Sequence, residues 1–239
     1  DPLSNVTTTT YDSAGRKTTV TDPEGRVTTY AYNATRNALA TTTDAKGGVV
    51  TFTLDAYGNL ANVKDALHHQ TTFTYDQFDR RITEKDANNK TTTTVYTDGG
   101  RVWKVTDANA QLTTYTYNNA YDLTGVAYAD SKTIANTYDA VGNRLTMVDW
   151  LGTQTYTYDA LNRVLTDTNP SSQTISYAYD EVGNMTTLTY PGSPAVAYTY
   201  DNAKRLQTVT DWPSRVTTYD SDTHGRLGSF TLPTGVATT

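Results

Sequence analysis

Residues 143–180 read NRLTMVDWLGTQTYTYDALNRVLTDTNPSSQTISYAYD and contain the same pattern twice. Tyr158-Asp159 is followed by a polar turn, an Arg and a run rich in β-branched residues, and Tyr179-Asp180 comes 21 residues later. The same anchor position recurs along the chain at Tyr11, Tyr32, Leu54, Tyr75, Tyr96, Tyr117, Tyr138, Tyr158, Tyr179, Tyr200 and Tyr219. Intervals of 19 to 22 residues between anchors predict a repeat architecture.

Each repeat is predicted to be a β-hairpin, as residues 96–118 illustrate. Residues 97–100 have the Asp and Gly content of a turn, residues 101–106 form a first strand, residues 107–110 a second turn and residues 111–117 a second strand. About 11 such repeats predict about 20 strands in an all-β antiparallel array. Since long twisted sheets rarely stay flat, we expect a curled sheet or part of a spiral shell or barrel.

The two strands of a repeat differ in pattern. In the second strand, Tyr115 and Tyr117 alternate with Thr114 and Thr116, which places aromatic side chains on one face and Thr on the other. The same aromatic alternation recurs at Tyr30/Tyr32, Phe52/Leu54, Phe73/Tyr75, Tyr156/Tyr158, Tyr177/Tyr179 and Tyr198/Tyr200. First strands instead carry apolar residues three apart, at Leu60/Val63, Val102/Val105, Leu145/Val148 and Leu206/Val209. Either a bulge separates these residues or both faces are partly covered.

The turn after each anchor has the form Asp-x-x-Gly in several repeats, for example 55–58 and 180–183. Asp accepts hydrogen bonds from its own turn, and Gly tolerates a positive φ. Gly is missing from the turns at 33–36, 76–80 and 159–163. In the turn at 159–163, Asn162 is expected to adopt the left-handed conformation in its place.

Composition agrees with an ordered but thin β-protein. Only 36% of residues are hydrophobic, yet the chain has 19 Tyr, and roughly one residue in five is Thr. Disordered chains are poor in aromatic and β-branched residues, so a folded wall with a large surface is predicted.

Charge excludes several classes of partner. The net charge of −6 provides no basic surface for nucleic acid or an anionic membrane. No apolar run approaches the roughly 20 residues of a membrane span.

The chain has no Cys, which excludes disulfides and thiolate metal sites and suits an exported protein.

The repeat resembles a known family. Gly-Arg/Asn-Leu, Asp-x-x-Gly and Thr-x-Tyr-x-Tyr-Asp at a 21-residue period resemble the YD repeats of rearrangement-hotspot (Rhs) proteins, of the C component of insecticidal Tc toxins and of teneurins. The resemblance covers the whole chain. It implies a sheet that spirals into a hollow shell, which encloses a C-terminal toxic domain in bacterial members and supports cell-surface adhesion in teneurins.

The resemblance also sets expectations for organisation. Residues 1–239 are expected to be one repeat array, cut from a longer chain. The plug motif and cleavage site of Rhs cores have no match before Thr239, and residues 22–25, Asp-Pro-Glu-Gly, are interpreted as an ordinary turn. The expected location is secreted, extracellular or at the cell surface.

No residue is predicted to be catalytic, to bind a cofactor or to ligate a metal. The Asp residues recur at turn positions, which explains them without a glycosidase pair or calcium loops. His68 and His69 share one turn and, with His224, are too few for zinc or a triad. Trp103, Trp150 and Trp212 are assigned to sheet packing, and the Tyr ladders to packing in preference to sugar stacking. Glycosylation patterns at Asn5, Asn33 and Asn184 are attributed to chance in a Thr-rich chain.

The leading hypothesis is therefore a structural, non-enzymatic wall segment of an exported, bacterial Rhs/YD-repeat protein that encapsulates a C-terminal effector. Its partners would be the rest of its own chain and the enclosed effector. The alternatives are a surface module for adhesion or glycan binding, and a filament that associates through open sheet edges.

Overall fold

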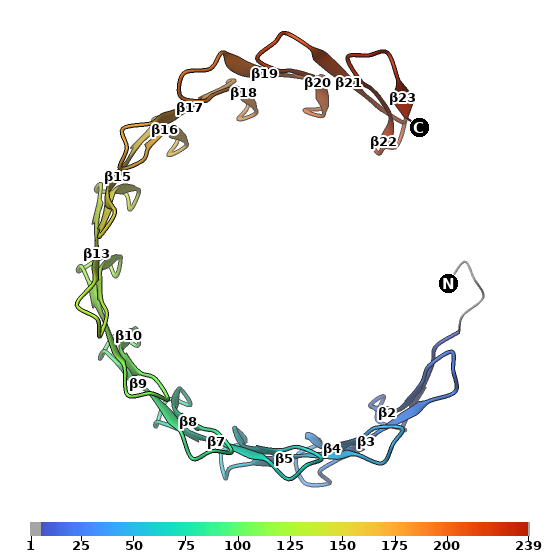
Figure 1. The fold of residues 1–239 in the computed structure, drawn as a ribbon. Coiled ribbons are helices and arrows are strands. Elements are labelled where there is room, and N and C mark those ends of the chain that lie inside the picture. Colours follow the sequence, from blue (N-terminus) through green and yellow to red (C-terminus); the bar gives the residue numbers. More distant parts are fainter. Residues whose placement is uncertain (1–5, 239) are drawn as a thin grey trace. The chain divides into compact units, whose positions relative to one another are not determined.

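A computed structural model describes residues 6–238, which form 23 strands and no helix. The chain divides into two compact units, unit 1 (residues 1–115) and unit 2 (residues 116–239). Figure 1 shows the ribbon of strands, coloured along the sequence. Within each unit, neighbouring strands of the sequence pair side by side and antiparallel. The predicted all-β array of antiparallel hairpin repeats is confirmed.

Two kinds of strand alternate along the chain. The odd-numbered strands, most of which have six residues, are called long here, and the even-numbered strands of five or six residues are called short. The long strands, which carry the Tyr anchors, and the short strands, which follow them, have these bounds: β1 Thr8–Tyr11, β2 Lys17–Thr21, β3 Val27–Tyr32, β4 Leu39–Thr43, β5 Val49–Leu54, β6 Leu60–Lys64, β7 Gln70–Tyr75, β8 Arg81–Lys85, β9 Thr91–Tyr96, β10 Val102–Thr106, β11 Leu112–Tyr117, β12 Leu123–Ala127, β13 Thr133–Tyr138, β14 Arg144–Asp149, β15 Gly152–Tyr158, β16 Val164–Thr168, β17 Thr174–Tyr179, β18 Met185–Thr189, β19 Ala195–Tyr200, β20 Leu206–Thr210, β21 Val216–Ser221, β22 Leu227–Thr231 and β23 Ala237–Thr238. We call the turn after a long strand the first turn and the turn after a short strand the second turn.

The wall is a single layer. Of the hydrophobic residues that the structure describes, only Val126 and Val196 are buried, each 7% exposed. Most Tyr rings of the long strands are half-buried, while many Thr residues between them are exposed. Side chains stay partly exposed in a sheet on which no second layer packs. This agrees with the thin wall predicted from composition.

A β-bulge resolves the odd spacing of the short strands. In the pairing of β5 with β6, Leu60 lies opposite Leu54 and Val63 opposite Phe52, while Ala61 is the extra residue. The bulge therefore brings Leu60 and Val63 to the same face, beside the aromatic side of the long strand. A similar register shift recurs in each described pairing of a long strand with the following short strand inside a unit.

The pair Leu145/Val148 does not follow this rule. Arg144 lies opposite Tyr138 and Met147 opposite Asn136, so these two residues take the aromatic-face positions. Leu145 is the bulged residue and is 37% exposed. The apolar spacing read from the sequence was one residue out of register here, and a one-residue slip moves side chains to the other face.

The two faces of the sheet differ in chemistry. The Tyr face carries the aromatic anchors, and the Thr face carries hydroxyl pairs that cross neighbouring strands. The Oγ1 atoms of Thr157 and Thr166 lie 2.6 Å apart, and those of Thr199 and Thr208 lie 2.7 Å apart. Such cross-strand pairs each stabilise a sheet by a few tenths of a kcal/mol or up to ~1 kcal/mol.

Candidate functional site

The first turns carry a recurring network of polar contacts, and the turn of Asp159 shows how such a turn is built. Its backbone N–H donates to Arg163 O at 3.0 Å, and Asn162 N–H donates to Asp159 O at 3.0 Å. Its Oδ1 accepts from the N–H groups of Leu161 and Arg163, both at 2.9 Å. The predicted role of these Asp residues as turn acceptors agrees with this geometry.

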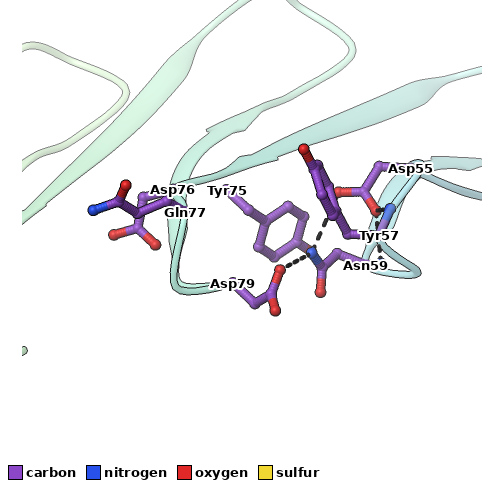
Figure 2. A pocket seen from close by; sticks show the side chains of 7 residues that line it. All are labelled: Asp55, Tyr57, Asn59, Tyr75, Asp76, Gln77 and Asp79. Carbon is purple, nitrogen blue, oxygen red and sulfur yellow. Dashed lines mark hydrogen bonds between the residues drawn. The ribbon is translucent and has the colours of Figure 1, made fainter.

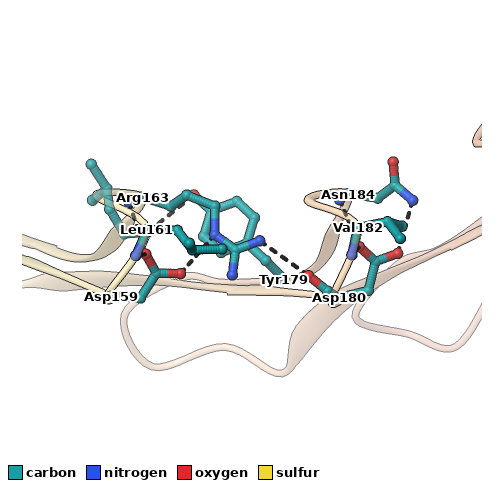
Figure 3. A network of polar contacts seen from close by, with 8 residues as sticks. Asp159, Leu161, Arg163, Tyr179, Asp180, Val182 and Asn184 are labelled. Carbon is teal, nitrogen blue, oxygen red and sulfur yellow. Dashed lines mark hydrogen bonds and ion pairs between the residues drawn. The ribbon is translucent and has the colours of Figure 1, made fainter.

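Arg163 then connects its own turn to the next repeat (Figure 3). Its Nε lies 2.6 Å from Asp159 Oδ2. Its guanidinium carbon stands 4.5 Å from the centroid of the Tyr179 ring, and Nη1 donates to Asp180 O at 3.0 Å. One side chain thus contacts the Tyr-Asp pair of the following repeat.

The Tyr anchor completes the connection in the opposite direction. The Tyr179 hydroxyl donates to Val164 O, the first residue of the preceding short strand, at 3.0 Å. The same bond, at 2.8 to 3.0 Å, is made by Tyr32, Tyr75, Tyr96, Tyr138, Tyr158 and Tyr200. The Tyr-Asp pair therefore joins these hairpins to their neighbours along one side of the sheet.

The first turns alternate strictly between two types. The residue with positive φ is Gly in one repeat and another residue in the next: Gly15, Asn37, Gly58, Asp79, Gly100, Tyr121, Gly142, Asn162, Gly183, Lys204, Gly225. The left-handed conformation predicted at Asn162 is thus confirmed. The true period of the array is two hairpins, which the 21-residue spacing alone did not reveal.

Contacts between repeats partly follow this alternation. An Arg of the preceding repeat lies beside four of the glycines, namely Gly58, Gly100, Gly183 and Gly225, and a Cβ built at Gly58 would lie 2.9 Å from Arg36 Nη1. In turns of the other type, a side chain of the preceding repeat can bond to the left-handed residue itself, as Asn143 Nδ2 does to Asn162 Oδ1 at 2.8 Å and Arg16 Nη1 does to Asn37 Oδ1 at 2.9 Å. The absence of a side chain at the glycine leaves room for the neighbouring Arg.

Where a first turn ends in Asn and not in Arg, an open pocket can lie beside the Tyr ring of the next repeat, as it does at Asn59 (Figure 2). Asn59 donates through Nδ2 to Asp79 Oδ1 at 2.7 Å and lies beside the Tyr75 ring. Asp55, Tyr57, Asp76 and Gln77 complete the lining. A second pocket follows Asn184 and includes Tyr200. Within residues 6–238, no Arg lies over the Tyr75 or the Tyr200 ring.

Two carboxylates of the first pocket, Asp55 and Asp76, have lowered pKa values, which do not suit a general acid. Burial, the largest single influence on Asp55, raises its pKa, but hydrogen bonds from Asn59, Gly58 and Tyr57 together outweigh it and lower the pKa. The hydrogen bond from the Arg80 side chain is the main cause that lowers the pKa of Asp76. A general acid of a glycosidase needs a raised pKa, and neither group has one.

These lowered pKa values predict an acid-sensitive array. Side-chain hydrogen bonds from Arg80 and Arg205 are the main causes that lower the pKa of Asp76 and Asp201 below the ordinary value of 3.8. A carboxyl whose folded pKa is lower than its unfolded pKa contributes stability above the unfolded value, and that contribution is lost as the pH falls through the folded pKa. We expect the urea midpoint to change little from pH 7 to about pH 5 and to fall below about pH 4. A midpoint that is unchanged at pH 3 would contradict this account.

Arg163 provides a graded test of the contact between repeats. Arg163→Ala should lower the free energy of unfolding by roughly 0.5–1.5 kcal/mol, because it removes the ion pair, the ring contact and the bond to Asp180 O. Arg163→Asn should cost less, since Asn184 bonds its own turn carboxylate, Asp180 Oδ2, at 2.8 Å from the equivalent position. Urea unfolding of the two variants measures the difference. Equal losses would show that the bond from Asn to its own turn carboxylate adds nothing at this position.

The histidines lie in turns, as predicted. His68 has a φ of 69°, and His69 places Nδ1 at 2.9 Å from Asp65 Oδ2. His69 occupies the position of Lys90 and Arg215 in other second turns. Among residues 6–238, no group of three His, Cys, Asp or Glu side chains is placed to hold a metal ion.

Two of the three Trp residues do not pack as expected. Trp150 and Trp212 lie in second turns, are about half exposed, and meet Tyr128 and Tyr190 edge-on. Trp103 is the bulged residue of β10, 42% exposed. In the sequence, both residues stand just after a strand, and this position did not show whether the side chain packs on the sheet or belongs to the turn. The assignment of Trp150 and Trp212 to sheet packing was therefore wrong.

Other expected features have simple positions. Residues 22–25 form a second turn, in which Gly25 N–H donates to Asp22 O at 2.9 Å. Asn33 and Asn184 belong to first turns, whereas Asn5 lies outside the described residues. Residues 6–238 include no long apolar helix of the kind that crosses a membrane.

Comparison with solved structures supports the fold. The chain is similar to the crystal structure of TcdB2-TccC3, with a TM-score of 0.70, 16% identity, and coverage of 96% of this chain and 16% of that one. It is also similar to the TcdB2-TccC3-Cdc42 crystal structure, with a TM-score of 0.63, 17% identity and coverage of 94% and 15%. The Tc holotoxin pore of Photorhabdus luminescens matches with a TM-score of 0.56, 15% identity and coverage of 95% and 18%. The chain therefore spans less than a fifth of the length of each of these proteins.

Sequence comparison gives the family. No curated protein matches the chain. The RHS Repeat model matches residues 1–26 and 11–49, and the Teneurin YD-shell model matches residues 64–224, which is 161 of the 239 residues. Because that model covers more than half of a chain whose hairpins are tied together by their Tyr-Asp pairs, the chain belongs to the Teneurin YD-shell family.

Proposed function

We propose that this chain is a non-catalytic wall segment of an exported protein, and that in the full-length protein the wall encloses a C-terminal effector domain. The single observation that carries the proposal is the Tyr-Asp-Arg network, which uses its polar side chains to join neighbouring hairpins. Carboxylates engaged in this way and with lowered pKa values are suited to holding a wall and poorly suited to chemistry.

The family supports this role, and so do the solved structures of Tc toxin complexes that share the fold. Residues 1–239 would be one continuous array in a longer, secreted polypeptide. Its partners would be the rest of that polypeptide and the enclosed domain.

Limited proteolysis of the full-length natural protein tests the proposal. We expect a non-repeat domain downstream of the repeats to resist protease under native conditions and to be cleaved once urea opens the wall. A downstream domain that is cleaved at the same rate in both conditions, or repeats that end without such a domain, would refute encapsulation.

A second role, adhesion to a glycan or a surface, is favoured by one observation. Tyr57 and Phe78 stand at the tips of consecutive first turns in unit 1 and are 86% and 67% exposed. Exposed aromatic side chains in neighbouring repeats are available for stacking on a ligand. Binding to a glycan array that disappears in Tyr57→Ser and Phe78→Ser would favour this role over the wall.

A further inference from the structure

Unit 2 contains two aromatic corners, each formed by a Tyr and a Trp of consecutive second turns. Tyr128 and Trp150 meet edge-on with ring centroids 6.4 Å apart and planes at 79°. Tyr190 and Trp212 meet with centroids 6.1 Å apart and planes at 88°. In each corner the Tyr begins a second turn, at the position where most repeats carry Asp, and the Trp lies in the next second turn.

The first corner holds a cation that belongs to this chain. The Lys132 Nζ lies 5.1 Å from the centroid of the Trp150 ring. Asp130 Oδ2 holds the same ammonium group at 2.8 Å. The face of an indole ring attracts a cation electrostatically, and Trp is the side chain that does so best. In this corner the indole face and the Asp130 carboxylate together hold an ammonium group.

The second corner has the same Tyr–Trp pair without the cation, on a turn in which Gly192, and not Ser193, has the positive φ that Ser131 has in the first corner. Pro194 immediately precedes its strand, as Lys132 does, because Ala195 pairs with Thr189 and Thr133 with Ala127. Gly192 likewise stands at the position of Asp130. Trp212 is 51% exposed. Among residues 6–238, no Lys or Arg lies over its ring.

We propose that the corner formed by Tyr190 and Trp212 binds the ammonium group of a lysine side chain supplied from outside residues 6–238. The ammonium would lie over the indole face as Lys132 lies over Trp150. The net charge of −6 favours the approach of a lysine-bearing segment. The proposal does not depend on whether the wall encloses an effector.

Titration with Nα-acetyl-lysine amide tests the proposal, with the indole N–H signals of the three Trp residues followed by NMR. We expect weak binding that shifts the Trp212 signal and leaves the Trp150 signal unchanged. The neutral isostere Nα-acetyl-norleucine amide should bind roughly tenfold more weakly, because it lacks the charge. An equal shift of the Trp212 signal with the lysine and the norleucine compounds would overturn the proposal. So would a shift of the Trp212 signal by methyl glucoside when the lysine compound causes none.

The variant Lys132→Met provides a gain-of-binding control. Removing the internal ammonium should expose the first corner, so Trp150 should begin to respond to the lysine compound. The Trp212 response should stay as it is, which reports that the variant is folded. A folded Lys132→Met protein in which Trp150 remains silent would contradict the claim that such corners accept an ammonium group.

Discussion

Tyr179→Ala is expected to weaken the folding of unit 2 by about 2–4 kcal/mol. The change removes a half-buried ring, a hydroxyl bond to Val164 O and the surface on which the Arg163 guanidinium rests. Tyr179→Phe should cost only about 1 kcal/mol, because it removes the hydroxyl bond alone. Urea unfolding gives the two losses.

Hydrogen exchange should show where the weakening occurs. In a repeat protein each hairpin depends mainly on its neighbours, so amides of β16, β17 and β18 should lose the most protection. Tyr57→Ala is the control, since that residue is 86% exposed on a turn tip and its loss should change stability by less than about 0.5 kcal/mol. If Tyr179→Phe is as damaging as Tyr179→Ala, the hydroxyl bond is the main contact and the ring packing is secondary.

Local features of this fold could be predicted from the sequence. The Tyr-Asp spacing gives the hairpins, and the alternation of Tyr with Thr gives the two faces, because strand side chains alternate with a period of two. Asp159 as a turn acceptor and Asn162 in the left-handed conformation follow from the chemistry of single residues. These features depend on residues close together in the chain.

Contacts between repeats could not be predicted in the same way. Arg163 meets Tyr179, 16 residues further on, only after the pairing register of two hairpins is fixed. The bulged position holds Ala61 in one repeat and Trp103 in another, so it has no signature in residue type. A signal did exist for the alternation of the first turns, since Gly is present in every second one. The contact that accompanies it is visible only in the structure, where an Arg of the preceding repeat lies beside Gly58, Gly100, Gly183 and Gly225.

Gly183→Val is the most direct test of that alternation and is expected to cost about 2–3 kcal/mol. Gly183 has a φ of +96°, a conformation in which a β-branched side chain is strained by roughly 1–3 kcal/mol. In addition, a Cβ there would lie 4.0 Å from Arg163 Nη1, so the two further methyl groups of Val would crowd the guanidinium that bonds to Asp180 O. Urea unfolding measures the loss, and hydrogen exchange at the amides of β16 to β18 locates it.

Asn162→Gly is the matched control in the neighbouring first turn of the other type. Asn162 already has a φ of +62°, and glycine adopts that conformation without steric cost, so backbone strain should not increase. The variant does lose the bond from Asn143 Nδ2, which should limit any change to about 1 kcal/mol in either direction. If the left-handed position of the Gly turns requires a residue without a side chain, Gly183→Val must be clearly worse than Asn162→Gly. Similar losses in both would mean that this position accepts a side chain and that the alternation does not depend on glycine.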